Sequence, residues 1–112
     1  MKPVIPSLRE KKRYLVFEIK SNTNFKQSSV EKAVTEEILK LIGTLGYSKA
    51  GVIFLKDNYK NNKGILRVGH KYVDEVKMAL GLIQKIEKKN LKINTIYVSG
   101  ILNKAKKYRK ED

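Results

Sequence analysis

The sequence contains no cysteine, a single histidine and only two prolines, both within the first six residues. The lack of cysteine excludes disulfide bonds and thiolate metal sites. No apolar run approaches the roughly 18 residues that a membrane-spanning helix needs. The N-terminus, MKPVIPSLREKK, also lacks the apolar core of a signal peptide. We therefore expect an intracellular, cytoplasmic protein that has no membrane partner.

Acidic residues are few, with 11 Asp and Glu against 25 Lys and Arg, which gives a net charge of +14. Self-repulsion at this charge destabilises a compact chain unless a polyanion offsets it. Nucleic acid is the commonest such partner in a cell, and an anionic membrane surface is the second possibility. A chain of 112 residues that is 41% hydrophobic can build one core. We expect a single RNA-binding domain over residues 1–112, with an irregular basic arm at 1–12 and a basic tail at 101–112.

Catalytic side chains are equally scarce. His70 and Asp74 have the helical i,i+4 spacing of a metal-binding pair, but a third ligand is missing. The adjacent pairs Glu36–Glu37 and Asp74–Glu75 point in different directions on a helix, which makes them poor acid–base dyads. The sequence has no phosphate-binding loop and no G-x-G-x-x-G motif. We expect no catalytic residue, no metal site and no bound cofactor in this chain.

Hydrophobic periodicity alternates between strand-like and helical spacing along the chain. The predicted elements are a strand at 13–20, a helix at 30–45 capped by Ser28 or Ser29 and ended by Gly46, strands at 50–56 and 65–69, a helix at 70–88, and a strand at 91–100. This order is the split βαβ pattern. It predicts an α+β two-layer sandwich of the ferredoxin-like or RRM-like kind, with a four-stranded antiparallel sheet and both helices on one face.

The last segment, ILNKAKKYRKED, predicts an extra basic helix. Ile101, Leu102, Ala105 and Tyr108 would form one apolar stripe, and lysines would occupy the remaining surface. A helix this short is marginal in water by itself. We expect its stripe to pack on the sheet face that the other two helices leave uncovered.

That sheet face is poor in rings for stacking bases. RNA-recognition modules carry aromatic residues on the third strand after a basic residue and a glycine. In KGILRV, residues 63–68, Ile65 and Arg67 occupy those places. Tyr14 is the one candidate platform on the first strand, and packing beneath the C-terminal helix is its alternative role. The candidates for RNA or partner contact on this face are Tyr14, Val16, Ile65 and Arg67.

Basic residues concentrate at both ends of the chain. The candidates for RNA binding are Arg9, Lys11, Lys12 and Arg13 in an N-terminal cluster, and Lys104, Lys106, Lys107, Arg109 and Lys110 in a C-terminal cluster. If the clusters meet in space, they form one surface for phosphates, which supplies affinity without sequence information. Three lysines of the predicted hairpin would extend this surface if they lie near it: Lys56, Lys60 and Lys63.

Three segments together resemble archaeal ribonuclease P protein component 2, the counterpart of a protein subunit in eukaryotic ribonuclease P and MRP. They are PSLREKKRYLVFEI at 6–19, GILRVGHKYVDEVKMALGLI at 64–83 and YVSGILNKAKK at 97–107. The resemblance implies that residues 6–14 and 98–107 are candidates for RNA contact. It covers nearly the whole chain in the expected order.

The resemblance implies a subunit of a ribonucleoprotein endonuclease that removes the 5′ leader from precursor tRNA. In that complex the ribonuclease P RNA performs the chemistry with Mg²⁺. The implied protein partners are component 3 and other ribonuclease P proteins. An alternative is a protein-interaction module of another RNA-processing or ribosomal complex, which would dock a partner through its open sheet face at Tyr14, Val16 and Ile65.

Overall fold

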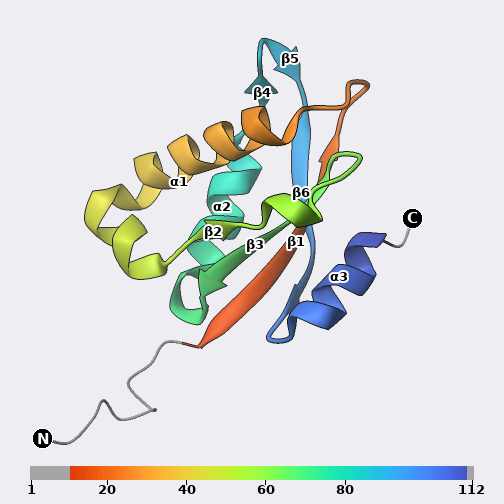
Figure 1. Cartoon of the computed structure of the whole chain (residues 1–112). Helices are drawn as coiled ribbons and strands as arrows, with labels where there is room; N and C mark the ends of the chain where they lie inside the picture. Colours follow the sequence, from red (N-terminus) through yellow and green to blue (C-terminus); the bar gives the residue numbers. More distant parts are fainter. Residues whose placement is uncertain (1–10, 111–112) are drawn as a thin grey trace, which may run out of the picture.

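The computed structural model describes residues 11–110, and for residues 108–110 it describes the backbone alone. The helices and strands, drawn in Figure 1, are β1 (Lys12–Lys20), α1 (Gln27–Ala50), β2 (Ile53–Phe54), β3 (Lys63–Gly69), α2 (Val73–Leu82), β4 (Lys85–Ile86), β5 (Lys89–Asn90), β6 (Lys92–Ser99) and α3 (Leu102–Lys110). Two short 3-10 turns complete the set: η2 (Lys56–Asn58) and η3 (His70–Tyr72).

The main sheet has the strand order β2-β3-β1-β6, and every neighbouring pair in it is antiparallel. Helices α1 and α2 lie together on one face of this sheet (Figure 1). The arrangement confirms the predicted split βαβ fold with its four-stranded antiparallel sheet. The register also shows which strand ends adjoin, because Tyr14 near the start of β1 lies opposite Ser99 at the end of β6.

Strand β1 is buried on both faces, although its sequence alternates. Leu15, Phe17 and Ile19 face the helices and belong to the main core. Val16 points to the other face and is equally inaccessible. This nine-residue strand therefore packs against α1 and α2 on one face of the sheet and contributes to a second apolar cluster on the other face.

Helix α1 is longer than predicted at both ends. It begins after Lys26, and no side chain caps its first turn, so neither Ser28 nor Ser29 is the cap. The chain departs from helical geometry at Gly43 (φ 76°, ψ 174°) and then resumes the helix, so the predicted end at Gly46 is wrong. The helix ends where Gly51 adopts the left-handed conformation (φ 61°) and donates its N–H to the carbonyl of Tyr47.

The second predicted helix, at 70–88, is also corrected. Helix α2 ends at Leu82, and the β4–β5 hairpin follows it. Glu87 and Lys88 form the tip of this hairpin with positive φ angles, which the sequence does not signal by Gly or Asn. Ile83 and Ile86, at the spacing that suggested the helix, are nevertheless buried. Apolar spacing identified which residues pack but did not distinguish a helix from a hairpin.

Helix α3 covers the second face of the sheet, as predicted from its apolar stripe. Val16, Ile65 and Ala105 form a small core with no exposed surface, separate from the main one. Four partly buried residues pack around this core: Tyr14, Leu55, Tyr97 and Leu102. The first residue of the predicted stripe, Ile101, is 54% exposed and lies outside the contact.

Candidate nucleic-acid interface

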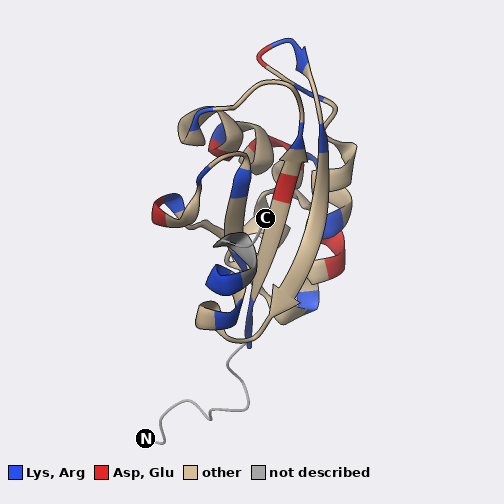
Figure 2. Ribbon diagram, turned by 90° about the vertical axis from the view of Figure 1, so that its right-hand side faces the viewer, with Lys and Arg blue, Asp and Glu red and all other residues tan. Residues whose placement is uncertain are grey.

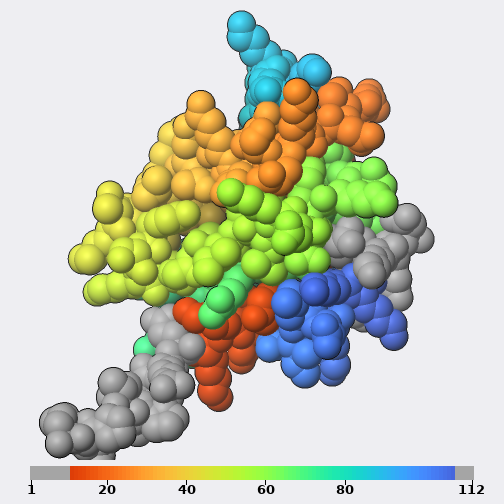
Figure 3. Space-filling view, viewed as in Figure 1, coloured from red at the N-terminus to blue at the C-terminus, as the bar shows by residue number. Residues whose placement is uncertain are grey.

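The two basic clusters meet at one end of the molecule. Because the start of β1 pairs with the end of β6, Arg13 lies beside the turn that leads into α3. A Cβ atom built on Gly100 would lie 3.4 Å from Nη1 of Arg13. Figure 3 shows the start of β1 and α3 side by side on the surface. The pairing of strand ends, which the sequence left open, brings the clusters together.

We call this surface the basic end, and its described residues are Lys11, Lys12, Arg13, Lys104, Lys106 and Lys107. Lys11, Lys104 and Lys107 are exposed, while the other members are partly buried. Arg9 lies outside the described residues, as do the side chains of Arg109 and Lys110. Their predicted roles in RNA binding stay predictions.

Two members of the basic end also have contacts inside the protein. Nη1 of Arg13 donates a hydrogen bond to the carbonyl of Lys12 at 3.1 Å. Nζ of Lys12 lies next to Gly51 at the end of α1, 3.1 Å from where a Cβ would stand. A cation is favourable at the C-terminus of a helix. Lys12 therefore has a structural role beside its candidate role toward phosphate.

Acidic residues lie elsewhere on the described surface (Figure 2). They are found on α1 and α2, in η2, and at the tip of the β4–β5 hairpin. Within the described strands of the main sheet, Glu18 is the one acidic residue, and its carboxylate lies 3.4 Å from Nζ of Lys20. Neither α3 nor the first half of β1 carries an acidic residue. Nothing acidic in these two elements offsets the charge of the basic end.

The sheet-face candidates are only partly accessible. Val16 and Ile65 have no exposed surface beneath α3, so they cannot contact RNA or a partner while that helix is in place. The alternative of a module that docks a partner through an open sheet face at these positions is contradicted for the same reason. Tyr14 and Arg67 remain partly exposed, and Tyr14 packs beneath α3, its alternative role. Nε of Arg67 is buried without a hydrogen-bond partner among the described residues.

The lysines of the predicted hairpin do not act as one group. Nζ of Lys56 lies 3.9 Å from a carboxylate oxygen of Glu31 on α1. Lys60 and Lys63 face each other across a backbone bridge at the start of β3. The positive charges of this segment are therefore divided between the helix layer and the far end of the sheet, away from the basic end.

The possible metal pair shows no further ligands. Nδ1 of His70 lies 3.3 Å from the carbonyl oxygen of Lys11, and the His70 N–H donates to the same oxygen at 2.7 Å. Within residues 11–110, no group of three His, Cys, Asp or Glu side chains is arranged to hold a metal ion. Among the described helices, none is long and apolar enough to cross a membrane.

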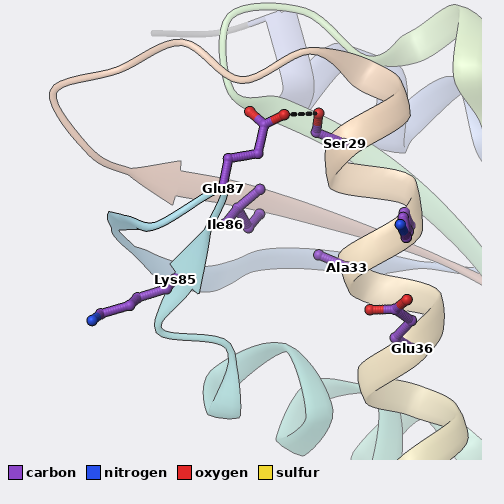
Figure 4. Close-up of a pocket in the computed structure, with 7 residues that line it drawn as sticks. Ser29, Ala33, Glu36, Lys85, Ile86 and Glu87 are labelled. Carbon is purple, nitrogen blue, oxygen red and sulfur yellow. Dashed lines mark hydrogen bonds between the residues drawn. The ribbon is translucent and has the colours of Figure 1, made fainter.

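A hollow of about 300 Å³ lies between α1 and the β4–β5 hairpin (Figure 4). Oγ of Ser29 donates to a carboxylate oxygen of Glu87 across it, at 2.9 Å. Acidic and basic residues line it in equal number, and Lys85 points away from α1. Its mixed charge does not favour a polyanion.

The hairpin itself was missed by sequence reasoning. It places Lys85, Lys88, Lys89 and the following Lys92 at the end of the molecule opposite the basic end (Figure 1). The available signal was four lysines within eight residues. The predicted helix at 70–88 included Lys85 and Lys88, and the predicted strand at 91–100 included Lys92, so the four lysines were not recognised as one cluster.

A model of the Rpp14/Pop5 family matches residues 13–110 of the chain. The chain belongs to the Rpp14/Pop5 family. The match includes the described part of both basic clusters from Arg13 onward, all three helices and the whole of the main sheet except the first residue of β1. The predicted family resemblance is confirmed.

Curated relatives of this Rpp14/Pop5 chain carry the name ribonuclease P protein component 2. The one from Thermococcus gammatolerans is 36% identical over 102 residues, which cover 91% of this chain and 85% of the relative. The one from Pyrococcus abyssi is 36% identical over 107 residues, covering 96% and 91%. The one from Methanocaldococcus jannaschii is 37% identical over 106 residues, covering 95% and 78%.

The fold of this family member also matches a solved structure. A chain in the cryo-EM structure of yeast Ribonuclease MRP superimposes with a TM-score of 0.66 at 12% sequence identity. The match covers 89% of this chain and 86% of the other. At this identity the likeness establishes the shared α+β fold.

Proposed function

We propose that this chain is a protein subunit of ribonuclease P that binds and stabilises the RNA which removes the 5′ leader from precursor tRNA. The observation that carries the proposal is the family match over residues 13–110, supported by relatives named ribonuclease P protein component 2. The chain contributes to a ribonucleoprotein endonuclease, and the RNA performs the chemistry with Mg²⁺. The proposed role of the chain is to bind phosphates.

The basic end is the surface that we assign to this role. Ala105 and Leu102 attach α3 to the sheet, which leaves Lys104 and Lys107 exposed on its outer side. Arg13 lies beside the same helix. Neutralising several phosphates at one site releases counterions and stabilises a compact RNA, whatever its sequence.

Protein partners require a different surface, because α3 closes the second face of the sheet. The remaining large apolar side chains that are well exposed lie mainly on the helix layer, where Leu45 of α1 is 69% exposed and Met78 of α2 is 60% exposed. A partner that docks on this layer would bury these side chains, which favours binding. We assign ribonuclease P protein component 3 and the other ribonuclease P proteins to this layer rather than to the sheet.

A charge-matched pair of triple variants tests the role of the basic end. The first variant is Lys104→Ala, Lys106→Ala and Lys107→Ala, and the control is Lys32→Ala, Lys40→Ala and Lys77→Ala on the helix layer. Both variants lose the same net charge. We expect the first to lower the magnitude of the slope of log affinity against log salt by about 2, since each phosphate contact contributes about 0.7 to 0.9.

The measurements are filter binding of a ribonuclease P RNA over a range of salt and cleavage of precursor tRNA by the reconstituted complex at limiting Mg²⁺. The α3 variant should bind the RNA more weakly and cleave more slowly. The helix-layer control should bind the RNA alone as the unmodified chain does. Equal losses in both variants would show that only total charge matters. That result would contradict the assignment of the basic end.

A further inference from the structure

A second concave surface lies at the end of the sheet opposite the basic end. It is a hollow of about 560 Å³, which we call the amide hollow. Five asparagines from three separate segments line it: Asn22 and Asn24 after β1, Asn61 and Asn62 in the turn before β3, and Asn90 in β5. Figure 1 shows these three segments together at the end of the molecule that carries the β4–β5 hairpin.

Asn62 holds the walls of the amide hollow in place. It is 6% exposed, and its side-chain oxygen accepts hydrogen bonds from the N–H of Phe25 at 2.9 Å and the hydroxyl of Tyr59 at 3.2 Å. Its side-chain nitrogen donates to the carbonyl of Thr23 at 2.8 Å. Its own carbonyl accepts from the N–H of Ile19 at 2.7 Å. One buried side chain therefore joins the loop after β1 to the turn before β3.

A second contact fixes the position of β5. Oγ of Ser21 donates to the carbonyl of Asn90 at 3.0 Å and accepts from the N–H of Thr23 at 3.3 Å. The three segments are thus connected by hydrogen bonds before any ligand binds. A preformed site loses less conformational freedom on binding than one that must be ordered by its ligand.

The other asparagines have unused amides. Asn22, Asn24, Asn61 and Asn90 are exposed, and their side chains make no hydrogen bond within the described part of the chain. Each offers donors and an acceptor. Mixed donors and acceptors suit the edge of a nucleobase, which also presents both, better than they suit a phosphate or a metal ion.

Positive charge stands at the rim of the amide hollow. Lys20 and Glu18 both line the hollow. Lys20 lies directly opposite the exposed Lys92 in the pairing of β1 with β6, so two basic residues stand beside one acidic residue here. Like charges that face each other across a sheet are destabilising unless an anion lies between them. Glu18 offsets part of this charge through its 3.4 Å contact with Lys20. A phosphate beside Lys20 and Lys92 would offset the rest.

We infer that the amide hollow binds one unpaired nucleotide of an RNA, with the base against the free asparagine amides and its phosphate beside Lys20 and Lys92. The inference rests on the proposed function, which makes RNA the partner of this chain. We assign an unpaired nucleotide because pairing occupies the Watson–Crick edge of a base, and the deep, narrow major groove of an RNA helix keeps side chains from the other edge. None of the residues that line the hollow is aromatic, so hydrogen bonds rather than stacking select the base.

The experiment compares two RNA probes on the full-length chain. One is a hairpin with an unpaired loop, and the other is a fully paired duplex with the same number of phosphates. The test variant is Asn22→Ala, Asn24→Ala and Asn61→Gly, where glycine suits the positive φ of position 61. The control variant is Ser28→Ala, Ser48→Ala and Gln84→Ala, which removes three exposed polar side chains that do not line the amide hollow.

The test variant should bind the hairpin about tenfold more weakly than the unmodified chain, because good amide–base pairs each discriminate by at least that order. Its salt slope with both probes should not change, since uncharged amides release no counterions. Its affinity for the duplex should not change either, because a paired base does not enter the hollow. The control should match the unmodified chain, and melting curves establish that each variant is folded.

The outcomes separate this inference from the proposed function. If the asparagine variant binds both probes as the unmodified chain does, the amide hollow is not a nucleotide site, while the basic end can still bind RNA. Equal weakening for hairpin and duplex would also overturn the inference, because it would indicate a general phosphate contact. If the unmodified chain binds neither probe, both the inference and the proposed function fail.

Discussion

Asn62 and Ser99 are the two polar residues that are buried in the described part of the chain. A buried amide is costly unless its polar atoms have hydrogen-bond partners. Both polar atoms of the Asn62 side chain have them, through contacts with Thr23, Phe25 and Tyr59. Asn62 therefore decides the shape of one end of the molecule, although its neighbour Asn61 has almost the same backbone conformation and no such role.

This difference predicts a contrast between two glycine substitutions. Both positions have positive φ angles, so Asn→Gly relieves the backbone at each and removes only the side chain. Asn62→Gly should lower the free energy of unfolding by about 2 kcal/mol, because three hydrogen bonds are lost and the Phe25 N–H is left buried. Asn61→Gly should change it little. Urea denaturation measures both, and equal effects would show that Asn62 does not brace the loops.

Tyr59 provides a second prediction at this scale. Its hydroxyl donates to the carbonyl of Phe25 at 2.8 Å, and burial raises its pKa from 10.0 to about 12. The folded state therefore holds the phenolic proton more tightly than the unfolded state. The stability from this group is fully present below pH 10 and is lost as the pH rises toward about 12.

The measurement is the free energy of unfolding at a series of alkaline pH values. The unmodified chain should lose stability more steeply between these two pH values than the Tyr59→Phe variant, which has no proton to lose there. Lysines that titrate in the same range are present in both proteins, so the difference isolates Tyr59. Parallel curves for the two proteins would be evidence against a raised pKa.

Helix α3 shows at the scale of an element how one buried residue can position many exposed ones. Ala105 has no exposed surface and packs on Val16 and Ile65. A side chain of this size lets the helix approach the sheet closely, and the lysines on either side of it in sequence are thereby directed outward. The position of the basic end therefore depends on an apolar contact.

This dependence can be tested by introducing one charge at two positions of the same helix. Ala105→Glu would bury a carboxylate and should release α3 from the sheet, lowering the free energy of unfolding by about 1–3 kcal/mol. Asn103→Glu adds the same charge at an exposed position and should be nearly neutral. Thermal melts and binding of a hydrophobic dye measure stability and exposure of the sheet face.

Only the Ala105 variant should bind the dye, because Val16 and Ile65 become accessible when the helix is displaced. If both variants remain equally stable and neither binds the dye, the contact between α3 and the sheet contributes little. The Ala105→Glu and Asn103→Glu variants would then bind RNA with equal affinity, since both carry the same added charge.

Helices and strands were predicted correctly where the apolar residues keep one spacing, and incorrectly where the chain bends or turns back on itself. The alternation in β1 and the apolar stripe of α3 both predicted the faces that are buried. The pattern near Gly43 and Gly46 could not show which glycine bends the helix, because both are compatible with a helix end. The hairpin at Lys85–Asn90 continues the spacing of α2, so periodicity alone could not detect it.

At the scale of the whole molecule, the two surfaces that we assign to RNA lie at opposite ends of the sheet. Lysine and arginine dominate the basic end, where β1 begins and α3 starts. The amide hollow lies where β1 ends. If both bind RNA, one chain would contact two segments of the same RNA at a fixed separation. Such a bridge would stabilise a particular RNA fold rather than merely neutralise charge.

The sequence by itself determined the order of the four strands of the main sheet and the three helices, the excess of positive charge and the resemblance to a family. These properties depend on neighbours in the chain, so they can be recognised locally. It could not show that the start of β1 adjoins the end of β6, or that five asparagines from three segments share a hollow. Those features were decided by the tertiary structure, because strand pairing and loop contacts join residues that are distant in sequence.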